Sequence, residues 1–417
     1  MTTETLLIEL GTEELPPKSL KTLATTFFQH IKLQLDDAKL SYSDIHWYAT
    51  PRRLAVKVDN LIANQADKAI EKRGPAVGVA FDAEGNASKA AQGWARSNGI
   101  TVAQAERLVT DKGEWLLYKT VEQGKHVDQL IPDMVNNAIA KLPVPKPMRW
   151  GSGRTQFIRP VHTLTLMYGA SVIAGESLNI RSNNLVTGHR FHHHGLVALT
   201  HANDYESALK AAHVMVDYQA RKETILQQIN AAATDIGGIV LPDDELLEEV
   251  TSLVEWPVVL IGSFDEEFLN VPAEPLIYSM KDHQKYFPVT NSEGKLLNKF
   301  IFVSNIDSKD PSQVIKGNEK VIRPRLADAE FFFKTDKKQT LESRLQSLES
   351  VLFQKQLGTV KAKSERIASL SEYVAENIGD NAAMAYRAGL LSKTDLMSDM
   401  VLEFPQVQGT MGKYYAQ

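Results

Sequence analysis

The sequence predicts an α+β chain in which residues 1–325 mix strands with helices and residues 326–417 are all helical. Short runs rich in β-branched and aromatic residues recur up to residue 306, separated by stretches with helical spacing of apolar residues. Beyond residue 325 no convincing strand pattern follows, while helical periods continue. Because 417 residues are too many for one ordinary core, two or three domains are expected.

The elements of residues 1–325 follow from local patterns. Residues 19–40 are expected to form an amphipathic helix that Ser19 caps, because Leu20, Leu23 and Phe27 recur near helical spacing. Strands and further helices are expected in the following order: strands at 6–8 and 53–58, helices at 87–98 and 127–142, strands at 161–168 and 171–180, a helix at 218–236, and strands at 256–261 and 300–306. This region could contain two subdomains, with a break near 150–160.

Residues 326–417 form the expected helical domain. The helical periods run through 341–357, 360–378, 382–392 and 394–404. The sequence around Met411–Tyr415 has no feature typical of the end of a protein. We therefore expect the 417 residues to be the front portion of a longer polypeptide.

Composition indicates a water-soluble protein. The net charge is −5, so any polyanion must bind to a local surface and not to the whole molecule. The chain has no cysteine, which excludes disulfides, thiolate zinc sites and a cysteine nucleophile. The start has no basic segment followed by an apolar run, and no stretch is apolar enough to cross a bilayer. We therefore expect a cytoplasmic protein with no membrane contact.

One segment stands out by its charges. Residues 134–203 contain a single carboxylate, Glu176, although the whole chain has 51 Asp and Glu residues. The same segment holds six of the eleven histidines, and aromatic residues lie among its basic residues. Because phosphates attract Lys and Arg, and unstacked bases lie on aromatic rings, this pattern favours nucleic acid as the partner.

Several motifs supply candidate contacts. In residues 146–154 two arginines flank Trp150, and two glycines allow close backbone approach; the alternative is a surface loop whose Trp packs on a neighbouring domain. Arginines also recur beside prolines, which hold the preceding residue extended; intramolecular ion pairs are the alternative there. The candidate RNA-binding residues are Arg52, Arg53, Lys146, Arg149, Trp150, Arg154, Arg159, His189, Arg190, Lys281, Lys285, Arg323 and Arg325.

Two of these motifs invite other chemistry. The run from His189 to His194 has four histidines but fits no zinc spacing, so we predict no metal there. Lys281, His283 and Lys285 alternate, so on a strand they would share one face that could hold phosphates; a strand edge with solvated charges is the alternative.

Asp395, Asp399 and Glu403 would share one face of a predicted helix. No histidine occurs after His283, so a His-Asp metal centre cannot be assembled from the helical region alone. Motifs for phosphate-binding loops, dinucleotide binding, zinc proteases and serine hydrolases are also missing. We therefore predict no catalytic residues and no cofactor in this chain.

The motifs taken together resemble the β subunit of the bacterial heterotetrameric glycyl-tRNA synthetase. The resemblance runs along the whole chain in the order of the family's motifs, which are residues 8–17, 50–54, 72–75, 148–151, 159–162, 188–191, 255–257, 283–287, 323–329 and 408–412. Each motif is short, but the set is specific.

The resemblance implies a fold and a function. It implies a B3/B4-like module of the tRNA-synthetase type over residues 1–325, then a degenerate HD-like helical domain without metal ligands over 326–417, with the C-terminal anticodon-binding part absent. It implies an α subunit that activates glycine with ATP and Mg, an α2β2 assembly, and a β subunit that binds tRNA(Gly) without catalysing a step. The alternatives are a metal-dependent HD-type phosphohydrolase using His189 to His194 with Asp395, and an assembly scaffold without RNA contact.

Overall fold

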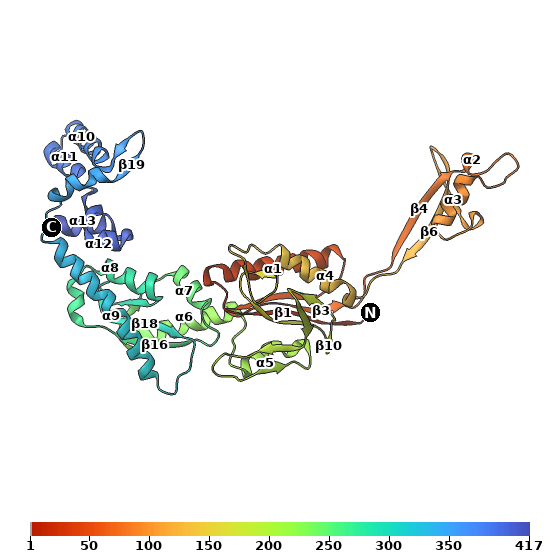
Figure 1. Ribbon diagram of the computed structural model, residues 1–417, viewed down its shortest axis with the longest axis horizontal. Helices are drawn as coiled ribbons and strands as arrows, with labels where there is room; N and C mark the ends of the chain where they lie inside the picture. Colours follow the sequence, from red (N-terminus) through yellow and green to blue (C-terminus); the bar gives the residue numbers. More distant parts are fainter. Residues whose placement is uncertain (1) are drawn as a thin grey trace. The chain divides into compact units, whose positions relative to one another are not determined.

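The computed structural model describes residues 2–417, which divide into two compact units (Figure 1). Unit 1 comprises Met1–Leu15, Ser19–Gly188 and Gly195–Ala211, and unit 2 comprises Pro16–Lys18, His189–His194 and Ala212–Gln417. Each unit contains sheets and helices of its own. The predicted α+β class is therefore confirmed.

The centre of unit 1 is a sheet with the strand order β11-β12-β9-β1-β3-β2, and β10 also pairs with β9. Its strands are β1 (Thr3–Thr12), β2 (Asp44–Thr50), β3 (Arg53–Ile62), β9 (Val161–Tyr168), β10 (Ser171–Val172), β11 (Glu176–Ser177) and β12 (Ile180–Asn183). In β1, Ile8 is opposite Val56 on one side and Leu166 on the other. The apolar run of β1 is fully buried, as expected of a strand that is covered on both faces of its sheet.

Two helices of unit 1, α1 (Pro17–Asp37) and α4 (Val127–Ala140), cover one face of this sheet (Figure 1). The apolar residues of α1 at helical spacing are buried, as predicted. The helix begins at Pro17 and not at a Ser19 cap, since the fixed φ of proline suits the first helical position. The side chain of Gln34 donates to the carbonyl of Met134 at 2.9 Å, which ties α1 to α4.

Residues between β3 and α4 form a small sheet with the order β4-β6-β5. Its elements are β4 (Lys68–Ala76), α2 (Val77–Ala80), α3 (Lys89–Ser97), η1 (Val102–Gln104), β5 (Glu106–Thr110) and β6 (Gly113–Glu122). Ala80, Ala91 and Leu116 form its buried core, and the Arg73 guanidinium lies 3.7 Å from the centre of the Trp115 ring. Of this insert, the sequence predicted only the helix at 87–98.

The end of unit 1 returns to the central sheet. A hairpin of β13 (Leu185–Thr187) and β14 (Leu196–Ala198) is followed by η2 (Ala202–Asp204) and α5 (Tyr205–Ala211). Tyr205 is fully buried, and its hydroxyl donates to the Glu9 carboxylate in β1 at 2.5 Å. This contact fixes α5 to the middle of the sheet.

Unit 2 contains an antiparallel sheet with the order β15-β17-β18-β16. The strands are β15 (Ile239–Val240), β16 (Val258–Ser263), β17 (Phe287–Thr290) and β18 (Leu296–Ser304), and two helices accompany them, α6 (Tyr218–Asp235) and α7 (Asp244–Thr251). Ile225 and Ile229 of α6 and Val250 of α7 pack in one buried cluster with Ile301 of β18. The helix predicted at 218–236 and the strands predicted at 256–261 and 300–306 are confirmed.

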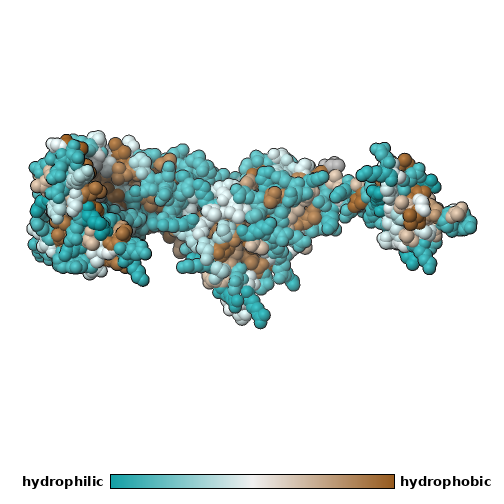
Figure 2. Space-filling view, turned by 90° about the horizontal axis from the view of Figure 1, so that it is seen from above, coloured by the Kyte–Doolittle hydropathy of each residue, from teal (hydrophilic) through white to brown (hydrophobic). Residues whose placement is uncertain are grey.

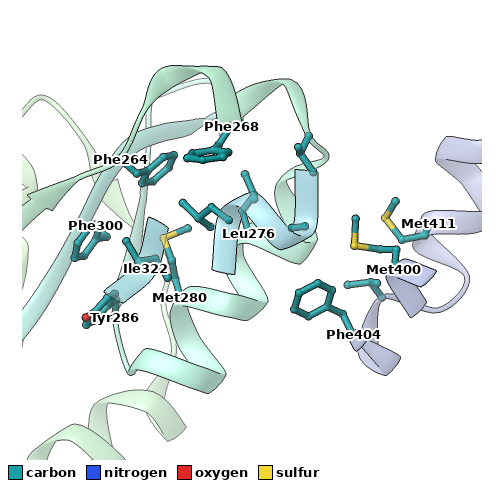
Figure 3. Close-up of a cluster of buried hydrophobic side chains, with 14 of the residues drawn as sticks. Phe264, Phe268, Leu276, Met280, Tyr286, Phe300, Ile322, Met400, Phe404 and Met411 are labelled. Carbon is teal, nitrogen blue, oxygen red and sulfur yellow. The ribbon is translucent and has the colours of Figure 1, made fainter. Parts of the chain in front are cut away.

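A second core of unit 2 joins this sheet to helices that follow it (Figure 3). The helices are η3 (Glu266–Asn270), α8 (Ala273–Tyr278), η4 (Ser279–His283), α9 (Pro311–Asp336), α12 (Asp399–Glu403), η7 (Pro405–Val407) and α13 (Thr410–Ala416). Phe300 of β18 and Ile322 of α9 share this core with Phe404 and Met411. The predicted boundary between residues 325 and 326 falls inside helix α9. The division into 1–325 and 326–417 remains a prediction.

The chain between α9 and α12 corrects one prediction. A helix over 341–357 is wrong: η5 (Glu342–Ser350) is a 3₁₀ helix, and β19 (Leu352–Gln354) and β20 (Gly358–Thr359) form a two-stranded hairpin. The Gln354 side chain accepts from the N–H groups of Gln356 and Leu357, and Gly358 has a φ of +84°, which together close the turn. The remaining elements are α10 (Val360–Ile378), α11 (Ala382–Leu391) and η6 (Thr394–Met397).

Candidate nucleic-acid interface

A short hairpin in unit 1 carries the densest group of predicted RNA-facing residues. β7 (Met148–Arg149) and β8 (Gln156–Phe157) pair so that Arg149 is opposite Gln156. Phe157 is buried and anchors the hairpin, and Gly151 has a φ of +60°, which glycine adopts without steric cost. The loop between the strands therefore projects from a fixed base.

The cations of this hairpin are exposed. Lys146, Arg149 and Arg154 lie at the surface, and within residues 2–417 none of them forms an ion pair. The Gln156 carboxamide lies against Arg149, and with its oxygen turned toward the guanidinium it accepts from Nε at 2.8 Å and Nη2 at 3.0 Å. Because this acceptor is neutral, it orients the guanidinium without cancelling its charge. We call Lys146, Arg149, Arg154 and the half-buried Trp150 between them the basic hairpin.

Two arginine–proline motifs meet beside the end of β1. The N–H of Thr12 donates to the carbonyl of Arg52 at 2.8 Å, and the N–H of Glu13 donates to the carbonyl of Pro160 at 2.9 Å. The Arg159 guanidinium donates to the carbonyls of Glu14 and Ile158, both at 3.0 Å. Both arginines are half-buried, and Arg159 is held by neutral backbone groups, so its charge also remains uncompensated by these bonds.

Arg53 is a different case, although it is adjacent to Arg52. It is 1% exposed, its Nη1 lies 3.4 Å from Oε2 of Glu9, and its Nη2 donates to the carbonyl of Thr187 at 2.6 Å. The alternative of an intramolecular ion pair therefore applies to Arg53. A guanidinium buried in this way is not available to a phosphate, and we leave it out of the proposed interface.

The candidate cations of unit 2 are mostly paired with carboxylates. Lys281 pairs with Asp243, Lys285 with Glu249 at 3.1 Å, and Arg323 with Asp265 at 3.1 Å. The predicted strand that would align Lys281 and Lys285 on one face is wrong, because Ser279–His283 form a π-helical turn. Arg325 is exposed on α9 and has no carboxylate partner in the described part of the chain.

The histidine run forms a structural loop. His189 is fully buried, and its Nδ1 accepts from the N–H groups of Phe191 and His192, both at 3.2 Å. Its ring stacks on His192 at 4.7 Å, and His192 in turn lies 5.1 Å from His213. Burial lowers the pKa of His189, so the neutral ring that accepts these bonds is favoured. Of this loop, only the exposed Arg190 is kept in the proposed interface.

This pKa shift predicts a pH dependence of stability. A histidine whose pKa is lower in the folded state stabilises the fold above its unfolded pKa of about 6.5, and that stabilisation is lost as the pH falls. In His189→Asn the amide oxygen can accept the same N–H bonds without titrating. Urea unfolding of both proteins should therefore show the stability advantage of wild type shrinking between about pH 7 and pH 5. His194→Asn makes the same substitution at the exposed end of the loop, and its stability relative to wild type should not change in this way with pH. An advantage that grows in acid would contradict the prediction.

The three carboxylates predicted on one helical face are separated. Ser398 is extended between η6 and α12, so Asp395, Asp399 and Glu403 do not belong to one continuous helix. The Asp395 carboxylate accepts from the N–H groups of Gly409 and Gly412, and so fixes the start of α13. Within residues 2–417 there is no cluster of three or more His, Asp or Glu side chains arranged to hold a metal ion.

Gln156 was missed by the sequence prediction. Its role follows from its position opposite Arg149 in the hairpin register. The available signal was the pair of short extended segments around Gly151 and Gly153, which is typical of a hairpin. With that hairpin assigned, the cross-strand partner of Arg149 could have been found.

The match of nearly the whole chain to one family model places it in the class of aminoacyl-tRNA synthetase subunits. The family described as glycyl-tRNA synthetase beta subunit matches residues 6–417. The chain belongs to this family, so the predicted resemblance is confirmed.

Full-length relatives agree with this assignment. The glycine–tRNA ligase beta subunit of Colwellia psychrerythraea is 72% identical over 416 residues, which are 100% of this chain and 60% of the relative. The corresponding subunit of Psychromonas ingrahamii is 62% identical over 417 residues, or 61% of its length. The chain thus spans about 60% of the curated relatives it matches. No helix within residues 2–417 is both long and apolar enough to cross a membrane.

Proposed function

We propose that this chain is the tRNA-binding, non-catalytic part of a glycine–tRNA ligase, and that the basic hairpin is a principal RNA contact. The observation that supports this is the set of three exposed cations, Lys146, Arg149 and Arg154, without ion-pair partners in the described residues. Phosphate contacts of this kind position an RNA, and Trp150 between them offers a ring for stacking. Arg52, Arg159, Arg190 and Arg325 extend the proposed contact set.

The proposal divides the work between two subunits. An α subunit would activate glycine with ATP and Mg, and the β subunit would hold tRNA(Gly) so that its end reaches the α active site, in a cytoplasmic α2β2 assembly. Residues 1–325 would correspond to a B3/B4-like module, and residues 326–417 to a degenerate HD-like domain. No cofactor is assigned to this chain, because its sequence contains none of the nucleotide-binding motifs considered above.

Salt-dependent binding tests the proposal. The triple variant K146A/R149A/R154A should bind tRNA(Gly) more weakly than wild type. The slope of log affinity against log salt should become shallower by about 2 to 3, because each lost phosphate contact removes about 0.7 to 0.9 from the slope. Fluorescence anisotropy with labelled tRNA at several salt concentrations measures both quantities.

A matched variant controls for net charge. K32A/K295A/K334A also removes three cations, of which Lys32 is half-buried and the other two are exposed, but each pairs with a carboxylate, at 2.8, 3.0 and 2.7 Å. It should leave affinity and slope close to wild type. Equal losses in both variants would show that overall charge matters and the hairpin does not. A wild-type chain with no salt-dependent RNA binding would instead favour the assembly scaffold.

A further inference from the structure

Helix α10 carries an apolar stripe that nothing in the described chain covers. Leu370, Tyr373, Val374 and Ile378 are 63%, 64%, 48% and 71% exposed. They lie at positions i, i+3, i+4 and i+8, so they share one side of the helix. We call these four residues the α10 stripe. Hydrophobic side chains reach the surface in this helical part of unit 2 (Figure 2).

The stripe is separate from the face through which α10 packs on α11. That face buries Ser364, Ala368 and Ala375 and lies about a third of a turn away around the helix. It holds α11 very closely, since a Cβ on Gly389 would come within 2.8 Å of the Cα of Ala368. Two helices joined through small residues thus form a thin layer, while the larger apolar side chains of α10 remain outside it.

Such a surface is costly in water. Helices with one apolar side normally bury it, and contiguous exposed apolar patches mark interaction sites in soluble proteins. The stripe therefore fits a covering helix that presents an aliphatic face.

We propose that, in the full-length subunit, a helix from chain outside these 417 residues packs on the α10 stripe and completes this layer. The length of the relatives supports this occupant: the match covers 60% of the Colwellia subunit, which leaves 40% of its length to supply such a helix. The proposal does not depend on RNA binding, because it rests on the exposed residues and on the family length alone.

The absence of cysteine in this chain gives a direct test. Leu370→Cys places a thiol in the stripe. Ser369→Cys places one at the preceding residue, which is exposed on the polar side of the helix. Both are made in the 417-residue chain and in the full-length subunit, with any cysteine of the additional length replaced by serine. Modification by a maleimide reagent should be at least about ten-fold slower for Leu370→Cys in the full-length subunit, because a packed site must open first. Ser369→Cys should react at similar rates in both.

The other outcomes overturn the proposal. Equal reactivity of Leu370→Cys in both proteins would show that the stripe stays open. Protection that appears only after the α subunit is added would assign the stripe to that partner. Protection in the 417-residue chain that increases with its concentration would assign it to a second copy. Hydrogen exchange of α10 in the unsubstituted proteins, slower in the full-length subunit, checks the result without a variant.

Discussion

Replacing Asp336 with alanine is expected to destabilise unit 2 by about 3 to 5 kcal/mol, the loss typical of breaking a buried ion pair. Asp336 is 1% exposed at the end of α9. Its Oδ1 accepts from Nη2 of Arg344 at 2.8 Å and from the N–H of Asp399 at 2.9 Å. Its Oδ2 accepts from the N–H of Met400 at 3.0 Å and from the hydroxyl of Tyr415 at 2.8 Å.

The size of this effect follows from what the alanine would leave behind. Arg344 is 6% exposed, so its charge would stay buried without its carboxylate, and the first turn of α12 would lose its anion. Burial, and then the bond to Asp336, raise the pKa of Tyr415, so the phenol remains a donor that would lose its acceptor. One carboxylate therefore connects α9 with η5, α12 and α13.

Urea unfolding followed by circular dichroism measures the loss. Asp310→Ala is the matched control, because Asp310 caps the other end of α9 at the surface, where its side chain accepts from Ser312. This control should lose much less stability than Asp336→Ala. Similar losses in the two variants would mean that Asp336 acts only as a local helix residue.

The sequence predicted elements best where burial and local pattern agree. The runs at Leu6–Ile8 and 161–168 became central strands because both their faces are covered, which an apolar run signals directly. The alternation around Lys281 was misleading, because Asp243 and Glu249 hold these lysines from a different element. Spacing along one segment contains no information about such partners.

The candidate site shows the same limit. Sequence identified the residue types and the carboxylate-poor segment, and the structure places Lys146, Arg149 and Arg154 at the surface there. It could not separate Arg52 from Arg53, which follow the same proline but differ in burial. The side of the sheet to which Arg53 points depends on the register of β3, which is set in part by its pairing with β1, far away in the sequence.

Replacing Arg53 with methionine should cost about 3 to 5 kcal/mol of stability in unit 1, because Glu9 is fully buried and would lose its cation. The Nε of Arg53 also donates to Oγ1 of Thr50 at 3.1 Å, and the bond to Thr187 ties β13 to β3. Burial and then the charge of Glu9 raise the pKa of Tyr205 well above its usual value. The Tyr205 hydroxyl therefore continues to donate to Glu9, but a neutral donor does not replace a guanidinium.

A double-variant cycle isolates the pair. The variant Glu9→Gln/Arg53→Met should recover a large part of the loss, because it leaves no unpaired charge inside the sheet, and the coupling between the two single variants measures the pair itself. Arg52→Met, at the adjacent and half-buried position, should cost clearly less in urea unfolding. If Arg53→Met instead unfolds like wild type but binds tRNA(Gly) more weakly, Arg53 would be an RNA contact after all, and its ion pair with Glu9 would have to open when RNA binds.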